Sequence, residues 1–448
     1  MLVSRAPRAA IVVASAALLL ATSACGSGRP EEATTDTQVR LYGTDGNMAN
    51  SFAEKLEDRA SLVNGMKGTM PMTPLQESFK ERLRKVDPKL NDYTYAAETY
   101  DAMVISALAA QLAGTTEPTQ IAKQIVGVTN GGQRCEDPVE CLRLARAGQD
   151  IEYRGVSVIR SGFTDAGEPS TASYATVHFN HEELDDGKTE FVGAGSESAA
   201  SSKTPPTAKK QRAGEKAKDG PLVFGGLLPK TGDLSLLYAS MGAAATLATR
   251  EINAAGGVLG KPAVWIEGDD GTNPEVAKAT VASHVRRGVH VIIGAGGSGI
   301  TRAVLPDVVA AGRVLFSPSN TDAGLSKVDD NGLYFRTAPP DTLQGRALAD
   351  VILRDGPHKI AIVARKDSYG EGLQENVRAE LERVGFGSDQ VKLLTYEPPA
   401  DAEAPPVDFS AGAKEIKDYG ANAVLIIGFA ESAHVITALA DAGVKIRH

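Results

Sequence analysis

Short apolar runs and helical stretches alternate from Pro221 to Thr321, and this alternation limits the possible fold more than any other feature of the chain. Runs such as VFGGLL, VIIG and VLFS are separated by segments with helical spacing. This order is typical of a parallel sheet whose faces are covered by helices. The pattern continues to the last residues, so we expect an α/β fold with doubly wound, mainly parallel sheets.

The alternation also places the individual elements of the second half of the chain. We expect helices over 236–253, 274–287 and 370–384, where apolar residues recur with helical spacing. The strands between and after them are expected at 222–227, 263–267, 289–293, 314–317, 359–364, 391–396 and 423–427.

The first half of the chain carries similar but less regular patterns. A strand over 39–43 leads into the turn Thr44-Asp45-Gly46-Asn47, and helices are expected over 73–86 and 96–112. Residues 155–160 and 174–179 alternate in the way that antiparallel strands do. Residues 196–220 contain almost no large apolar side chain, so we expect a disordered linker there.

The first 25 residues have the composition of a bacterial export signal. Arg5 and Arg8 precede an apolar stretch over 9–21, which is shorter than the roughly 20 residues that a membrane-spanning helix requires. The sequence Thr22-Ser23-Ala24-Cys25 resembles a lipobox, in which Cys25 would be lipidated and hold the protein at the outer face of the cell membrane. Since Thr22 replaces the usual Leu, ordinary cleavage after Ala24 is the alternative. Residues 26–38 would form a polar tether.

The remaining cysteines favour an exported protein. If Cys25 carries a lipid, Cys135 and Cys141 are left, and their short spacing is compatible with a disulfide in an oxidising compartment. A metal site is the weaker alternative, because no neighbouring His completes a ligand set. We expect no metal and no cofactor. The net charge of -9 argues against nucleic acid as a partner, and the basic residues within 203–218 are interpreted as part of a solvated linker.

A glycine-rich loop follows the strand over 289–293. The sequence Gly294-Ala295-Gly296-Gly297-Ser298-Gly299 fits G-x-G-x-x-G, but the next strand ends in SPSNT without the acidic residue that would hold a ribose. We interpret the loop as a site for a small anion, which Ser298 and the backbone N–H groups at a helix N-terminus would bind. Asp269 and Asp270 are interpreted as turn carboxylates rather than a metal pair.

Many motifs along the chain resemble the type 1 periplasmic binding proteins, in the branched-chain amino-acid receptor family of ABC transporters. In the second half they are PLVFGGLLPKTGD, EINAAGGVLGKP, FRTAPPDTLQGRALAD, ARKDSYGEGL and LIIGFAES. In the first half they are YGTDGN, YAAETYDAM and the segment around Cys135 and Cys141. The resemblance covers roughly 39–182 and 221–448, in the reverse of the family's order. It therefore implies a circular permutation, in which joining His448 to the strand at 39 restores that order.

The resemblance implies two lobes around a ligand cleft. Lobe I would consist of 221–337 together with 70–150. Lobe II would consist of 338–448, 39–69 and most of 151–195, which would form a crossover and a terminal hairpin.

The resemblance also implies which residues bind the ligand. From lobe I, two loops would bind the α-carboxylate of an amino acid through Gly297, Ser298, Ser319, Asn320 and Thr321. From lobe II, Tyr369 would close over the ligand and Asp45 would receive the ammonium group. Phe429 and Leu237 lie near positions where the family uses aromatic residues. Taken singly, Asp45, Tyr369 and Ser298 could also cap a turn or a helix.

The function implied is that of an extracytoplasmic solute-binding protein of an ABC importer. It would bind a branched-chain or related amino acid by hinge closure and present it to a membrane permease. The alternative is a ligand-sensing receptor module for an amide or small organic acid, without transport. Catalysis has little support, since G-x-S-x-G, H-E-x-x-H and a Cys/His pairing are all missing from the sequence.

Overall fold

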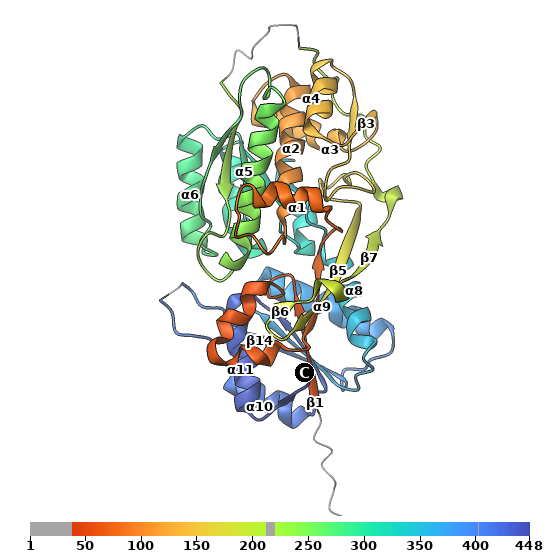
Figure 1. Ribbon diagram of the computed structural model, residues 1–448, viewed down its shortest axis with the longest axis vertical. Helices are drawn as coiled ribbons and strands as arrows, with labels where there is room; N and C mark the ends of the chain where they lie inside the picture. Colours follow the sequence, from red (N-terminus) through yellow and green to blue (C-terminus); the bar gives the residue numbers. More distant parts are fainter. Residues whose placement is uncertain (1–37, 212–219, 402) are drawn as a thin grey trace, which may run out of the picture. The chain divides into compact units, whose positions relative to one another are not determined.

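The computed structural model describes residues 38–211, 220–401 and 403–448, which are built around two sheets (Figure 1). One sheet has five strands, all parallel, in the order β12-β11-β10-β8-β9. Their bounds are β8 (Val223–Leu227), β9 (Val264–Ile266), β10 (Val291–Gly294), β11 (Val314–Ser317) and β12 (Tyr334–Arg336).

The other sheet has nine strands and is also mainly parallel. Its main path is β14-β13-β15-β1-β2-β5-β6, while β16 pairs with β1 and β7 pairs with β5. Only the pairs made by β5 are antiparallel. The bounds are β1 (Gln38–Thr44), β2 (Lys67–Pro71), β5 (Thr171–Asn180), β6 (Glu183–Leu184), β7 (Glu190–Gly195), β13 (Ile360–Arg365), β14 (Val391–Tyr396), β15 (Ala423–Ile427) and β16 (Lys445–Ile446). The expected α/β class with mainly parallel sheets is confirmed.

Strand β1 lies in the interior of the nine-stranded sheet. It is parallel to β15 on one side, with Tyr42 opposite Leu425. It is also parallel to β16, with Val39 opposite Ile446, and to β2. The first described strand is therefore enclosed by strands from the last 30 or so residues of the chain.

Eleven α-helices are described, and local sequence explains several of their ends. At the start of α6, Pro274 occupies the first turn and Asn273 accepts hydrogen bonds from the next backbone N–H groups. Gly114 ends α2 in the left-handed region. The bounds are α1 (Glu77–Arg84), α2 (Ala96–Ala113), α3 (Pro118–Val128), α4 (Pro138–Arg146), α5 (Tyr238–Ala254), α6 (Pro274–Arg286), α7 (Ser298–Ala310), α8 (Asp341–Leu353), α9 (Ser368–Arg383), α10 (Ser410–Tyr419) and α11 (Ala433–Asp441).

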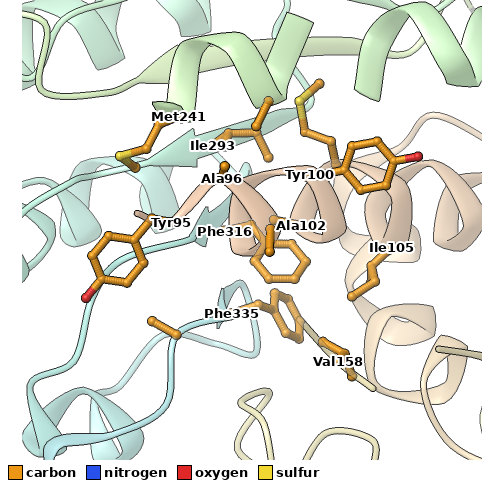
Figure 2. Packing of buried hydrophobic residues seen from close by; sticks show 14 of the residues in the cluster. Tyr95, Ala96, Tyr100, Ala102, Ile105, Val158, Met241, Ile293, Phe316 and Phe335 are labelled. Carbon is orange, nitrogen blue, oxygen red and sulfur yellow. The ribbon is translucent and has the colours of Figure 1, made fainter. Parts of the chain in front are cut away.

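Helix α2 is buried along its whole length. It packs against α5, α3 and α4, and its many alanines allow this close approach (Figure 1). Figure 2 shows Phe316 of β11 and Phe335 of β12 packed beside α2, with Tyr95 at the edge of the cluster and its hydroxyl pointing away from the apolar residues. The same helix therefore fills the core and places a polar group at its boundary.

The edge strand β9 carries Trp265, the single tryptophan of the chain. Its indole lies over Gly226 of the neighbouring strand β8. A Cβ at Gly226 would come within 2.8 Å of the indole ring. Glycine at this position thus makes room for the ring.

The predicted disulfide is present between Cys135 and Cys141. It connects β3 (Gln133–Cys135) to the first turn of α4, and β3 pairs in parallel with β4 (Ile151–Tyr153). The bond therefore fastens a short turn at the end of a helix.

The prediction of a strand over 155–160 is wrong. The carboxylate of Asp101 accepts hydrogen bonds from the backbone N–H groups of Val156, Ser157 and Val158 at 2.7–3.0 Å. These donors are therefore not available for a sheet, and the segment is a loop. The expected strand over 174–179 is confirmed as part of β5, which pairs with β2 and β7 instead.

The prediction of disorder over 196–220 is wrong for its first 16 residues. The backbone N–H of Lys209 donates to the Leu112 carbonyl, and that of Gln211 donates to the Arg146 carbonyl. The Gln124 side chain donates to the Pro206 carbonyl. Residues 196–211 are therefore ordered despite their polar composition, because backbone carbonyls and a side-chain amide of neighbouring helices form hydrogen bonds with them. The rest of the segment, 212–219, lies outside the described residues.

The predicted export signal, the lipidation site Cys25 and most of the tether lie outside the described residues. Within the described ranges, no helix combines the length and the apolar character needed to cross a lipid bilayer.

Candidate functional site

Asp45 lies in the turn after β1, at the carboxyl end of the strand. The turn is fixed by Asn47, whose side chain accepts from the Thr44 backbone N–H and donates to the Ile426 carbonyl of β15. Gly46 is needed here, because a Cβ would come within 2.5 Å of the Gly428 carbonyl oxygen. The turn therefore cannot shift without moving the end of β15.

Three side chains from separate parts of the chain donate hydrogen bonds to the Asp45 carboxylate. They are the Tyr95 hydroxyl at 2.8 Å, the Gln344 amide at 2.8 Å and the Tyr369 hydroxyl at 3.1 Å. Asp45 is only 5% exposed, and burial raises the pKa of its carboxyl, an effect that these hydrogen bonds oppose. A carboxylate held in this way is suited to receive a cation such as an ammonium group.

Tyr369 is placed by the start of α9. Asp367 caps this helix by accepting from the Gly370 N–H at 2.8 Å. The Tyr369 hydroxyl donates to Asp45 and pairs with the Thr44 hydroxyl at 2.8 Å. Its ring stacks on Phe429, with centroids 5.4 Å apart, and the Arg365 guanidinium lies 3.8 Å from the centroid of Phe429. The structure thus brings three predicted residues, Asp45, Tyr369 and Phe429, into one cluster.

The glycine-rich loop lies between β10 and α7. Helix α7 begins at Ser298, with Gly297 before it. The Gly296 N–H already donates to the Asp270 carboxylate at 2.7 Å. The Ser298 hydroxyl oxygen accepts from the Asp322 N–H at 3.3 Å. An anion at this loop would therefore have to be bound by Gly297 and Ser298 rather than by Gly296.

The loop after β11 is tied to the glycine-rich loop. The Ser319 hydroxyl donates to the Gly296 carbonyl at 2.8 Å. The Asn320 amide donates to the Ala295 and Gly296 carbonyls at 3.0 Å. Both side chains therefore hold the glycine-rich loop in place, whereas the buried Thr321 side chain lies beside the Asp341 carboxyl group.

Asp270 and Asp269 behave as the sequence predicted, as turn carboxylates. Asp269 accepts from the backbone N–H groups of Lys230, Thr231 and Gly271. Burial raises the pKa of Asp270 to about 7.

Helix α8 contacts both groups of predicted residues, the loop after β11 and the turn at Asp45. The N–H of Asp341, its first residue, donates to the Thr321 carbonyl at 2.7 Å. One turn later, Gln344 donates to Asp45 and to the Thr69 carbonyl. Neither Asp341 nor Gln344 was assigned a role from the sequence. Both lie on the buried face of α8, whose other residues are small or apolar, and this burial is known only from the structure.

Tyr95 was also missed, although the motif YAAETYDAM begins with it. It precedes α2 with a φ of 58°, a value that a non-glycine residue adopts only at some cost. Burial and the charge of Asp45 raise the pKa of its hydroxyl well above the usual range. An aromatic residue before a helix has no distinctive sequence pattern, so only the fold reveals its contact.

Leu237 is buried just before α5, where its carbonyl accepts from the Ser240 hydroxyl at 3.0 Å. These contacts do not test its predicted role against a ligand side chain, which stays a prediction.

A cavity of about 360 Å³ opens between loops that follow strands of both sheets, and Gly232, Asp233, Thr272, Glu431 and His434 are among its lining residues. Burial, together with the charge of Glu431, raises the pKa of Asp233 to about 6.

The fold and the buried cluster at strand ends define a class of α/β proteins with ligand sites at the carboxyl edges of parallel sheets. Residues 221–447 match the family model described as periplasmic binding protein, and the chain belongs to this family.

Several curated proteins are similar to this chain. It is 30% identical over 224 residues to the Leu/Ile/Val-binding protein homolog 1 of Brucella melitensis, covering 49% of this chain and 57% of that protein. It is 34% identical over 139 residues to the leucine-specific-binding protein of Salmonella typhimurium, covering 30% and 37%. The chain thus spans less than two thirds of the length of these relatives.

About half of the chain also aligns with solved structures. The leucine-binding protein of Thermotoga maritima aligns with a TM-score of 0.43 at 20% identity, over 50% of this chain and 61% of that one. A branched-chain amino-acid transporter substrate-binding protein of Streptococcus pneumoniae, in complex with isoleucine, aligns with a TM-score of 0.43 at 23% identity, over 51% and 63%.

Proposed function

We propose that this chain is a solute-binding protein for an amino acid, branched-chain or related, which it binds between its two sheets. The observation that carries this proposal is the Asp45 carboxylate, buried and held by Tyr95, Gln344 and Tyr369. In this proposal it would receive the ammonium group of the ligand. The similarity to Leu/Ile/Val-binding proteins supports an amino-acid ligand.

Recognition would use both sides of the site. The carboxylate of the ligand would lie at Gly297, Ser298 and Thr321, and its ammonium group at Asp45, with Tyr369 and Phe429 beside the side chain. Since these groups come from loops of both sheets, a ligand that contacts both favours the closed arrangement over an open one. Closure is then a population shift driven by differential affinity.

Calorimetric titration of the purified chain tests the proposal. The four probes, which all carry a short branched aliphatic group, are L-leucine, L-valine, L-leucinamide and isovalerate. Isovalerate lacks the ammonium group and should not bind. Asp45→Ala should weaken binding of the ammonium-bearing probes at least about 30-fold, an effect of roughly 2 kcal/mol. Asp441→Ala, at an acid that pairs with Arg59 on the surface, is the control. Binding that survives Asp45→Ala would contradict the proposal.

We further propose that the protein acts outside the cytoplasm, anchored through Cys25, and delivers its ligand to an ABC permease. The family and the named relatives support this role. Cells should incorporate labelled palmitate into the chain, and Cys25→Ser should abolish this labelling. Uptake of the bound amino acid should fall when the protein is deleted. Normal uptake after deletion, together with ligand binding, would favour the alternative of a sensory receptor for an amide or organic acid.

The order of the two halves is also part of the proposal. We infer that the chain is a circular permutation of the family's arrangement, because β1 pairs with β15 and β16 from the other end of the described chain. A rearranged chain that starts at 221, joins 448 to 38 and ends at 211 should fold and bind the same ligand. Failure of the rearranged chain to fold would contradict the permutation without affecting the binding experiment above.

A further inference from the structure

Asp270 lies between β9 and α6 and is completely buried. Its carboxylate joins this segment to the glycine-rich loop, because Oδ1 accepts from the Thr272 N–H at 2.8 Å and Oδ2 accepts from the Gly296 N–H at 2.7 Å. The Gly296 carbonyl in turn accepts from the side chains of Ser319 and Asn320. A chain of hydrogen bonds that starts at Asp270 therefore connects three loops at the carboxyl edge of the five-stranded sheet.

The proposed position of the ligand's carboxylate begins at the residue after Gly296. Helix α7 starts at Ser298, and its N-cap Gly297 has no side chain that could accept from the first N–H groups of the helix. The carboxylates of Asp270 and of the ligand would then be bound by donors of adjacent residues, whose Cα atoms are about 3.8 Å apart. Two negative charges so close together disfavour each other.

The charge of Asp270 changes within the physiological pH range. Burial, together with the charge of Asp269, raises the pKa of Asp270 to about 7, although its two backbone hydrogen bonds oppose this effect. Burial lowers the pKa of His284 on α6, so this residue is neutral near pH 7. The other charged groups on the neighbouring elements form ion pairs of their own, which are Lys230 with Glu267, Lys278 with Glu275, and Arg302 with Asp322.

We propose that Asp270 is a positioning residue that couples binding of the ligand's carboxylate to the uptake of a proton from the solvent, so that carboxylate ligands bind more tightly in an acidic medium. Ionised Asp270 repels the second carboxylate, whereas the protonated group does not and keeps an oxygen that can accept from the Gly296 N–H. This inference rests on the proposed function, because it assumes that the ligand's carboxylate lies at Gly297 and Ser298.

Calorimetric titration of the purified full-length chain at pH 7, in two buffers with different enthalpies of ionisation, counts the protons taken up on binding. If the second carboxylate strengthens proton binding at Asp270 tenfold, each L-leucine should bring about 0.4 proton with it. L-leucinamide has the same side chain and ammonium group but no carboxylate. It should bring no proton beyond those that its own amine takes up, which a titration of the free ligand measures.

The variant Asp270→Asn keeps the size of the side chain and removes its charge. Between pH 6 and 8.5, the affinity of the unsubstituted chain for leucine should fall about sevenfold more than that of the variant, the reciprocal of the tenfold effect on proton binding. Asp307→Asn, at an exposed acid of α7, is the matched control and should behave like the unsubstituted chain. Weaker binding by Asp270→Asn with an unchanged pH profile would show a purely structural role and overturn the inference.

The two probes also separate the inference from the proposed function. If Asp270→Asn does not fold, the comparison of leucine with leucinamide in the unsubstituted chain decides. Equal proton uptake with both probes, after correction for the amine, would overturn the inference and leave the proposed function intact. Binding of neither probe would refute both.

Discussion

The Tyr95 hydroxyl donates a hydrogen bond to the Asp45 carboxylate at 2.8 Å, which joins the residue before α2 to the turn after β1. Tyr95 packs beside the core around α2, and Asp45 belongs to the nine-stranded sheet. The bond therefore connects the start of α2 to the carboxyl end of β1 at the predicted ligand site.

Tyr95→Phe should weaken ligand binding about tenfold, because a hydrogen bond to a charged group contributes roughly 1.5 kcal/mol or more. The aromatic ring and its packing remain, so the melting temperature should change little. Titration with the tightest ligand checks the affinity. Tyr419→Phe, whose hydroxyl donates to the Asp389 carbonyl near the surface, is the matched control. Equal loss of affinity in both variants would rule out the role of Tyr95.

Glu168→Gln should reduce the free energy of unfolding by about 3–5 kcal/mol, because it leaves the Arg336 guanidinium, 1% exposed, without its counter-ion. Urea unfolding measures this change. The control is Glu190→Gln, which removes the partner of Arg354 in an exposed pair and should leave stability nearly unchanged. Similar midpoints for both variants would show that the buried pair is not important for stability.

Reduction of the disulfide between Cys135 and Cys141 should lower the free energy of unfolding by about 2 kcal/mol, the loop-closure effect for residues six apart. Ligand affinity should be unchanged, because β3 and α4 carry none of the predicted binding residues. Unfolding and titration with and without reductant check both statements, and the double variant Cys135→Ser with Cys141→Ser should match the reduced protein. A loss of affinity would contradict this separation.

Stability should fall as the pH rises from about 4.5 to 8 because of Glu98. Burial raises the pKa of Glu98 from 4.5 to about 8, so in this window the folded state binds a proton that the unfolded state has lost. The slope from this group is at most roughly 1.4 kcal/mol per pH unit, and its contribution is fully present only below pH 4.5. Glu98→Gln should flatten the profile measured by thermal unfolding. An unchanged slope would contradict the assignment.

The sequence predicts the elements well where apolar runs are closed by turn residues. The strands expected at 314–317, 391–396 and 423–427 coincide with β11, β14 and β15. The loop over 155–160 was missed because its conformation depends on Asp101, more than 50 residues away in the chain. The order of 196–211 was missed for the same reason, since its partners are carbonyl groups of other helices.

The residues of the candidate site were likewise predicted only in part. Motifs with a family resemblance led to Asp45, Tyr369 and Phe429, which the structure brings together. Asp341 and Gln344 were not found, because a polar residue on a helix becomes informative only when its burial and its hydrogen-bond partners are known. Both properties depend on tertiary structure rather than on local sequence.

The position of Trp265 on β9 has a practical consequence for spectroscopy. Its emission reports on the packing around Gly226 in the five-stranded sheet, whereas Tyr95 and Tyr369 absorb at the Asp45 cluster. Excitation selective for tryptophan will therefore follow the unfolding of the five-stranded sheet, whereas tyrosine absorption sums over 11 residues. The single tryptophan thus gives the unlabelled chain one local optical probe, away from Asp45.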